Sequence, residues 1–119
     1  MLLTADTPQR YKDQKDAILF AILVSPSMLA EHQPASLKER PTSAIRTALE
    51  CAYSVLQARI IATPHDIMGI LFFGTEESNY NGFDNCYLQM DLDVPDADSI
   101  KDLKRLLEDE DMFAERLKP

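Results

Sequence analysis

Two uninterrupted apolar runs dominate the pattern of hydrophobic and polar positions along the chain. Ala17 to Val24 is apolar throughout and is followed by Ser25-Pro26-Ser27, and Ile67 to Phe73 contains no polar side chain and is followed by Gly74. Short apolar runs without alternation, bounded by turn residues, are typical of strands buried on both faces, as in parallel sheets. The pattern therefore predicts two central strands.

The segment between these runs has the period of an amphipathic helix. Pro41-Thr42-Ser43 offers a start signal, and apolar residues recur at i, i+3, i+4 and i+7 from Ile45 to Ile60. Thr63-Pro64 ends the pattern, because the residue before proline avoids helical angles. A strand, helix and strand of this length are almost always parallel and right-handed, so we expect the two strands to be parallel.

A third strand of a different kind is predicted after the turn signal Asn81-Gly82. Polar and apolar residues alternate from Cys86 to Leu92, which is typical of a half-exposed, antiparallel edge strand. The alternation assigns Cys86, Leu88, Met90 and Leu92 to one face, and Tyr87, Gln89 and Asp91 to the other.

A second helix is predicted from Ser99, which resembles the start of a capping box with Asp102. Its apolar stripe runs from Ile100 to Leu107, and the acidic run after it disfavours continuation of the helix. These elements predict an α/β, Rossmann-like three-layer fold, in partial form, with about three strands and two helices. We divide the chain into a flexible lead-in (1–14), the domain (15–110) and a C-terminal tail (111–119).

Composition limits the functions open to this chain. It has 119 residues, 45% of them apolar, which is enough for one domain with a modest core. Twenty acids against twelve bases give a net charge of −8, which repels nucleic-acid backbones and anionic lipid. No apolar run approaches the roughly 20 residues that span a bilayer, and no signal peptide is visible, so we expect a soluble intracellular protein without a membrane partner. Cys51 and Cys86 lack metal-site spacing and are expected to be free, mostly buried thiols.

Several local sequences, in their order and spacing, resemble one known family. They are Lys15-Asp16-Ala17-Ile18-Leu19-Phe20, Pro41-Thr42-Ser43-Ala44, Arg59-Ile60-Ile61, Gly69-Ile70-Leu71-Phe72-Phe73-Gly74-Thr75-Glu76, Tyr87-Leu88-Gln89 and Leu92-Asp93-Val94-Pro95-Asp96-Ala97. Together they resemble the amino-terminal von Willebrand factor A-like domain of the smaller subunit of the Ku heterodimer, in a form similar to fungal sequences. The resemblance implies a partial, truncated von Willebrand A-like fold, because the family's domain continues beyond the position of Pro119.

The resemblance also implies a role in double-strand break repair by non-homologous end joining and in telomere maintenance, in the nucleus. The implied partners are the larger Ku subunit and end-joining factors. The family holds DNA ends with a β-barrel, its bridge and a SAP module, none of which fits in this chain. No cofactor and no catalysis are expected, and the sequence contains no GxxxxGK[ST] loop to support a helicase activity.

Metal-binding A domains carry an Asp-x-Ser-x-Ser motif after the first strand, where its oxygens suit magnesium. The corresponding positions here are Ser25, Ser27 and Leu29. Without the anionic ligand and one hydroxyl, this degenerate site is not expected to bind a metal. We expect the two serines to satisfy backbone groups at the end of the strand.

Two surfaces are candidates for protein interaction. In the expected topology the later strands are missing, so the first strand has a free edge that could pair with another chain or form a homo-oligomer. The candidate residues there are Ala17, Leu19, Ala21 and Leu23. The second candidate is the acidic run Glu108, Asp109, Glu110 and Asp111, which is either a solvated helix end or a docking surface for a basic partner. An alternative function is a stand-alone half-domain that acts as an adaptor or decoy, oligomerises through its first strand and does not bind DNA.

Overall fold

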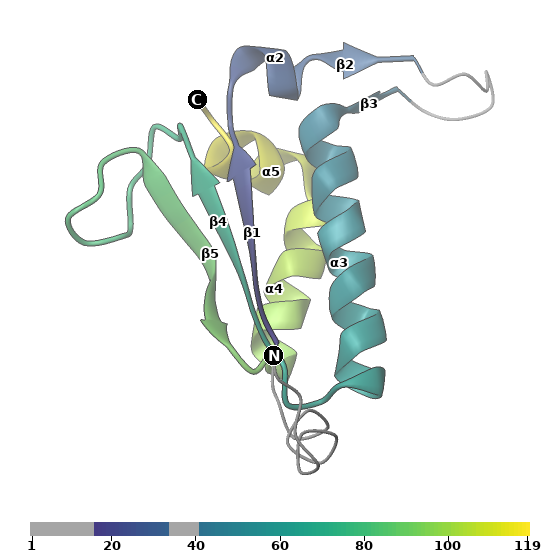
Figure 1. Cartoon of the computed structure of the whole chain (residues 1–119). Coiled ribbons are helices and arrows are strands. Elements are labelled where there is room, and N and C mark those ends of the chain that lie inside the picture. The colour runs from purple at the N-terminus through teal and green to yellow at the C-terminus, as the bar shows by residue number, and fades with distance from the viewer. Residues whose placement is uncertain (1–15, 34–40) are drawn as a thin grey trace, which may run out of the picture.

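The computed structural model describes residues 16–33 and 41–119 (Figure 1). The lead-in assigned to residues 1–14 lies outside this part of the chain. The elements are β1 (Ala17–Leu23), α2 (Pro26–Leu29), β2 (Glu31–His32), β3 (Thr42–Ser43), α3 (Ala44–Ala62), β4 (Ile67–Phe73), β5 (Cys86–Asp93), α4 (Ala97–Glu108) and α5 (Glu110–Arg116).

The main sheet has the strand order β1-β4-β5. β1 and β4 are parallel and in register from Ala17 opposite Ile67 to Leu23 opposite Phe73, and β5 is antiparallel to β4. This confirms the α/β class, the parallel pair and the antiparallel edge strand. The short antiparallel pair of β2 and β3 was not predicted.

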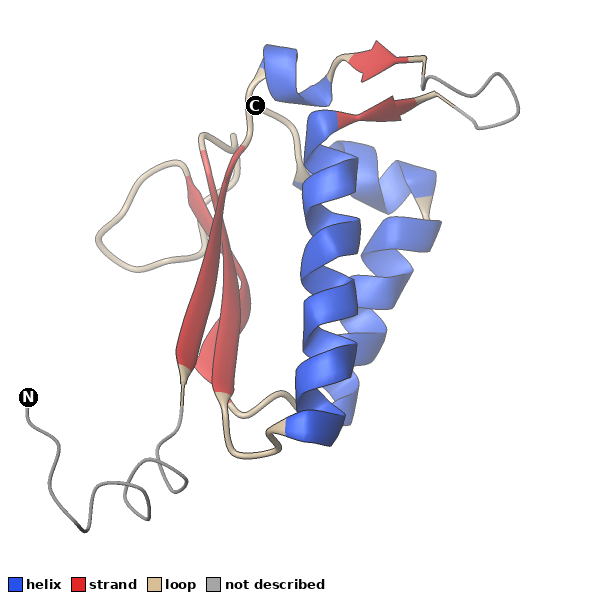
Figure 2. Cartoon of the chain, turned by 45° about the vertical axis from the view of Figure 1, so that its right-hand side comes forward, coloured by secondary structure: helices blue, strands red, loops and turns tan. Residues whose placement is uncertain are grey.

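The long helices cover one face of the sheet. Figure 2 shows the helices on one side of the strands, and the core contains Ile22 of β1, Ile70 and Phe72 of β4, and Leu49 and Leu56 of α3, all buried. Along β1, exposed residues alternate with more buried ones. The prediction that this strand is buried on both faces is therefore wrong, because the described residues place no layer on the opposite face.

The alternation predicted for β5 is also wrong, because β5 contains irregularities in register. Leu71 lies opposite Leu88, but the preceding Ile70 lies opposite Met90, so one extra residue, Gln89, is inserted in β5. The insertion turns buried Met90 toward the helices, whereas Leu88 shares the outer face with Leu71. Sequence alternation cannot reveal a bulge, because it assumes a period of exactly two.

Residues 111–119 differ from a simple tail. α5 includes most of them, and its Phe113 is 8% exposed while the following Leu117 is fully buried in the core. Their packing against the core makes this segment continuous with the rest of the fold. The signal was present in the spacing of Met112, Phe113 and Leu117, but the segment is too short for periodicity alone to decide.

Local signals explain where the helices begin. Ser43 caps α3 by accepting a hydrogen bond from the N–H of Arg46 at 3.2 Å. α4 begins at Ala97 rather than at Ser99, because the Asp96 carboxylate accepts the N–H of Ser99 at 2.7 Å. Asp102, expected to complete a capping box, instead points toward the sheet and accepts a hydrogen bond from Gln89.

Within residues 16–33 and 41–119, no helix is both long and apolar enough to cross a membrane. Both cysteines are free thiols, as predicted. The expectation that they are buried is wrong for Cys51, which lies on the exposed side of α3, and Cys86 is half-buried.

Candidate protein-interaction surfaces

β1 presents an unpaired backbone edge. Within the described residues it pairs with β4 alone, through bonds such as Val24 N–H to the Phe73 carbonyl (2.7 Å) and Ile67 N–H to the Asp16 carbonyl (2.9 Å). The N–H and C=O of one residue point to the same side of a strand, and this side alternates from each residue to the next. Since Asp16 and Val24 bond toward β4, the even-numbered residues of β1 do so too. The N–H and C=O groups of Leu19 and Ala21 therefore point away from it.

The same odd-numbered residues also expose their side chains. Leu19 is 48% exposed and Leu23 is 42% exposed, and Ala17 and Ala21 are exposed as well. All four lie on the face of the sheet opposite the helices. The predicted interaction residues of β1 thus combine free backbone groups with apolar side chains, which is the combination that favours pairing with another strand.

The apolar surface continues across the outer face of the sheet. Leu23 lies opposite Phe73, which is 38% exposed. A second register shift in β5, between the positions opposite Ile70 and Met68, precedes Leu92, which is 41% exposed and whose backbone lies beside Gly69, the partner of Leu19. Monomeric proteins rarely leave contiguous large apolar patches uncovered, and such patches usually mark contact surfaces. The structure therefore brings the β1 candidates together with residues of β4 and β5 that sequence analysis did not select.

A cluster of Asp16, Arg59 and Asp66, which we call the clasp, holds the residue before β1 in place. The Asp66 carboxylate accepts the N–H of Asp16 at 2.9 Å and pairs with the guanidinium of Arg59 at 2.5 Å, and Arg59 also contacts the Asp16 carboxylate at 3.2 Å. The hydroxyl of Thr63, the N–H of Asp16 and the guanidinium of Arg59 together hold the pKa of Asp66 below its ordinary value. The clasp joins the start of β1 to the end of α3 and the start of β4.

The residues after β1 do not fit a metal ion. Ser25 caps α2 by accepting the N–H of Met28 at 3.2 Å, and its hydroxyl lies 3.1 Å from the hydroxyl of Ser27. Leu29 packs its side chain against the core and offers no ligand atom. Two neutral hydroxyls without a carboxylate are a poor donor set for a divalent cation. Ser25 satisfies a backbone group, as expected, whereas Ser27 bonds to Ser25.

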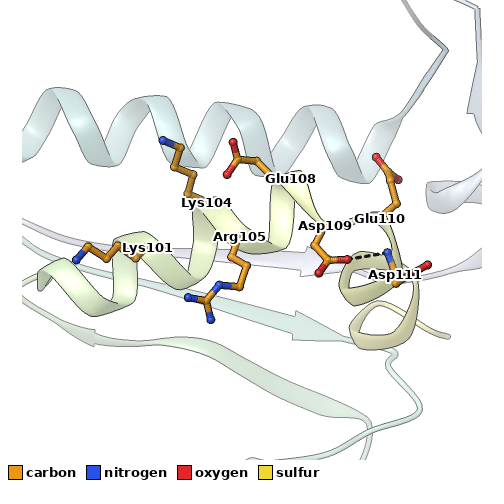
Figure 3. Close-up of a pocket in the computed structure, with 7 residues that line it drawn as sticks. All are labelled: Lys101, Lys104, Arg105, Glu108, Asp109, Glu110 and Asp111. Atoms are coloured by element: carbon orange, nitrogen blue, oxygen red, sulfur yellow. Dashed lines mark hydrogen bonds between the residues drawn. The ribbon is translucent and has the colours of Figure 1, made fainter.

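The acidic run lies at the junction of α4 and α5. Asp109 ends α4 and caps α5. Its carboxylate accepts the N–H of Asp111 at 3.0 Å (Figure 3) and the N–H of Met112 at 3.1 Å. The prediction that the helix stops at this run is confirmed. Acids at the start of α5 also face the favourable end of the helix dipole.

Arg46 of α3 holds the α4–α5 junction in place. Its guanidinium donates to the carbonyl of Leu107 at 2.8 Å, to both carboxylate oxygens of Glu110 at 3.2 Å, and lies 4.2 Å from the ring centroid of Phe113. Sequence analysis did not select Arg46, because its partners are more than 60 positions away.

The hollow beside this junction mixes both charges. It is lined by the acidic run together with Lys101, Lys104 and Arg105 of α4 (Figure 3). The Asp109 carboxylate caps α5 and the Glu110 carboxylate pairs with Arg46, so within the acidic run, and among the described residues, only Glu108 and Asp111 have carboxylates that form neither a cap nor an ion pair. A surface of mixed charge with two free acids attracts a basic partner less than four free acids would. The β1 surface is therefore the stronger candidate.

Comparison with known proteins is consistent with this architecture. Residues 17–118 match the family model of the Ku70/Ku80 N-terminal alpha/beta domain. Among curated relatives, the ATP-dependent DNA helicase II subunit 1 of Coccidioides immitis is 49% identical over 120 residues, covering 92% of this chain and 18% of that protein. The protein of the same name from Chaetomium globosum is 53% identical over 109 residues, covering 83% of this chain and 17% of its own length. The one from Schizosaccharomyces pombe is 40% identical over 114 residues, covering 96% and 18%.

The chain spans less than one fifth of the length of these curated relatives. The matched domain is a non-catalytic domain of Ku, and the helicase label belongs to the names of the longer proteins. With a match over residues 17–118 and fungal relatives near 50% identity, the chain belongs to the family of Ku70/Ku80 N-terminal alpha/beta domains.

Proposed function

We propose that this chain is the amino-terminal part of the smaller, Ku70-type subunit of a nuclear DNA end-joining complex, where it makes protein contacts and does not hold DNA. The fungal relatives are named as subunit 1 of their complexes, which favours this subunit over the larger one. The proposal includes the larger Ku subunit and end-joining factors as partners, and roles in non-homologous end joining and telomere maintenance.

The observation that carries the proposal is the uncovered edge and outer face of β1. Leu19 and Leu23 expose apolar side chains where backbone groups are also unpaired, and such a surface is suited to protein rather than to a phosphate backbone. The net charge of −8 adds to this preference, because an acidic chain repels DNA.

A co-purification experiment tests the proposal. The tagged chain is co-expressed with the larger Ku subunit of a fungal relative, and its binding to a blunt DNA end is measured separately by mobility shift. We expect the larger subunit to be retained and the chain alone to leave the DNA unshifted. If neither the larger subunit nor end-joining factors are retained, the repair function fails for this chain.

A matched pair of variants locates the contact. Ala21→Lys places a charge on the outer face beside the free edge of β1, whereas Gln57→Lys adds the same charge on the exposed side of α3. Lysine on an edge strand discourages pairing with another chain. We expect Ala21→Lys to lower retention of the larger subunit and Gln57→Lys to leave it unchanged. Equal retention by both would remove the β1 surface from the proposal.

The free edge of β1 also supports the alternative of a half-domain adaptor or decoy that self-associates. Analytical ultracentrifugation at micromolar concentration separates the alternatives. Self-association that Ala21→Lys abolishes, without retention of any end-joining protein, favours the adaptor. A monomer whose first strand is nevertheless protected from hydrogen exchange counts against it.

A further inference from the structure

The loop between β4 and β5, residues 75–85, presents two aromatic rings that take no part in the core. Tyr80 is 42% exposed and Phe83 is 58% exposed, and their centroids lie 5.1 Å apart at an interplanar angle of 70°. Figure 1 shows this loop projecting from the sheet beyond the body of the domain. We call residues 75–85 the aromatic loop.

A tight turn sets the two rings side by side. The N–H of Phe83 donates to the carbonyl of Tyr80 at 3.0 Å, and Gly82 between them has φ of 84°. A positive φ at the third residue, with no such angle at Asn81, is the pattern of a type II turn, which requires glycine or asparagine there. The turn therefore holds both rings on one end of the loop.

Side-chain amides hold the base of the aromatic loop. Asn79 pairs with the backbone of Leu88 through both side-chain atoms, accepting its N–H at 2.6 Å and donating to its carbonyl at 3.1 Å. Asn85 donates to the carbonyl of Thr75 at 2.9 Å, and its own N–H is bound by the Ser78 hydroxyl at 2.7 Å. A loop fixed in this way loses little conformational entropy when a ligand binds.

The charge of the aromatic loop has a single sign. It contains Glu76, Glu77 and Asp84 and no lysine, arginine or histidine. Glu76 pairs with Lys118 at 3.1 Å, whereas the carboxylates of Glu77 and Asp84 form no ion pair among the described residues. Of these two acids, Asp84 directly follows Phe83 in the chain. Exposed aromatic rings attract cations through the ring quadrupole, and a carboxylate without an ion-pair partner adds the attraction of its charge.

We propose that the aromatic loop is a docking site for a short arginine- or lysine-rich segment of a partner protein, bound through Tyr80, Phe83 and Asp84. Single-stranded nucleic acid also stacks on aromatic rings, but such sites add basic residues that follow the backbone, and this loop has none. The inference goes beyond the proposed function, since it uses a different surface from β1 and holds whichever subunit the chain represents.

Fluorescence anisotropy with a labelled peptide of alternating arginine and glycine tests the proposal on the full chain. Loss of one ring by Tyr80→Ala or Phe83→Ala is expected to weaken binding about 2- to 5-fold, from the ordinary strength of an exposed cation–π contact. Phe83→Leu keeps apolar bulk without a π face and should weaken binding similarly. Ile61→Ala, at an 85% exposed position on α3, is the control and should have no effect.

The charge contribution has its own matched pair. Asp84→Asn should weaken peptide binding at low salt, whereas Glu50→Gln, on the exposed side of α3, should not. Circular dichroism confirms that each variant keeps the fold. The proposal is overturned if the peptide does not bind, if the ring variants bind it as tightly as the original chain, or if a single-stranded oligothymidine binds more tightly than the peptide.

Discussion

Arg59 donates a hydrogen bond to Asp66 across 2.5 Å, and this ion pair ties the last turn of α3 to the residue before β4. The Asp66 side chain is only 6% exposed, so removal of Arg59 would leave a carboxylate that water cannot easily reach. Asp16 contacts the same guanidinium with a side chain that is 67% exposed. The two carboxylates therefore differ in burial while sharing one partner.

Asp66→Asn is expected to lower the midpoint of thermal unfolding more than Asp16→Asn does. The first change removes a buried charge, replaces one of its two acceptor oxygens by a donor and leaves Arg59 with one exposed carboxylate partner, whereas the second removes an exposed charge that solvent screens. Thermal unfolding followed by circular dichroism measures both variants. Equal midpoints for the two would show that burial of Asp66 contributes nothing to the clasp.

Stability should fall in acid through the titration of Asp66. Its pKa is lowered in the folded chain by the Thr63 hydroxyl, the Asp16 N–H and the Arg59 guanidinium, so the folded state binds this proton less readily than the unfolded state does. The contribution is fully present above the ordinary value of 3.8 and is lost as the pH falls through the lower folded pKa. Urea unfolding at pH values from 5 down to 2 should therefore show a shallower decline in Asp66→Asn than in the original chain. Parallel declines would contradict this assignment.

Alanine should destabilise the domain more at Gly74 than at either of the other two glycines. A Cβ at Gly74 would lie 2.5 Å from the Val24 carbonyl oxygen at φ of 90°, and one at Gly69 would lie 3.0 Å from the Met90 carbonyl oxygen. Gly82 has φ of 84° but no atom within 4 Å of the added carbon. Gly74→Ala combines strain with a backbone clash and should cost the most, with overpacking at Gly69 costing about 1–3 kcal/mol.

Gly82→Ala is the control for conformational strain without a clash. One alanine held at positive φ should lower the free energy of unfolding by about 1–3 kcal/mol, which is less than the loss at Gly74. Urea unfolding gives the free energy of unfolding for each variant. A Gly74→Ala chain as stable as Gly82→Ala would show that β4 and β1 can separate at their carboxyl ends without cost.

The sequence pattern predicted β1, α3 and β4 closely because each carries a complete local signal. The two apolar runs have the length of strands, and α3 has a capping serine, a helical period and a terminating Thr63-Pro64. The candidate edge of β1 followed from the expected strand order. These features depend on residues close together in the chain.

The rest depended on contacts between distant residues. The insertion of Gln89 reverses which side of the sheet the following side chains of β5 face. The bond from Arg46 to Glu110 joins residues that are 64 positions apart. One face of β1 is exposed because helices cover only the other face of the sheet (Figure 2). An apolar run in the sequence does not show how many faces of its strand are covered. The sequence showed the Asn81-Gly82 turn that brings Tyr80 and Phe83 together. It did not show that both rings are exposed to solvent and in contact with each other.

Leu117→Ala should destabilise the domain strongly, because its side chain is fully buried at the end of α5. Truncation of a buried leucine typically costs about 2–5 kcal/mol, through lost burial and the cavity that remains. Glu115→Ala, at an exposed position of the same helix, is the control and should change stability by less than about 0.5 kcal/mol. Urea unfolding compares the two. Equal stability would mean that α5 is peripheral to the core.

Amide exchange along β1 should alternate with a period of two. The N–H groups of Phe20 and Ile22 point toward β4 and should exchange slowly, whereas those of Leu19 and Ala21 point to the free edge and should exchange quickly in dilute protein. A second copy or another chain paired with the edge would slow the latter two.

Hydrogen exchange followed by NMR at two protein concentrations measures this pattern. If the edge mediates self-association, Leu19 and Ala21 become protected at the higher concentration in the original chain but not in Ala21→Lys, where position 21 carries the charge. Uniform protection of all four amides in a dilute monomer would mean that the edge is already covered within the chain, and the free edge of β1 could no longer explain any partner.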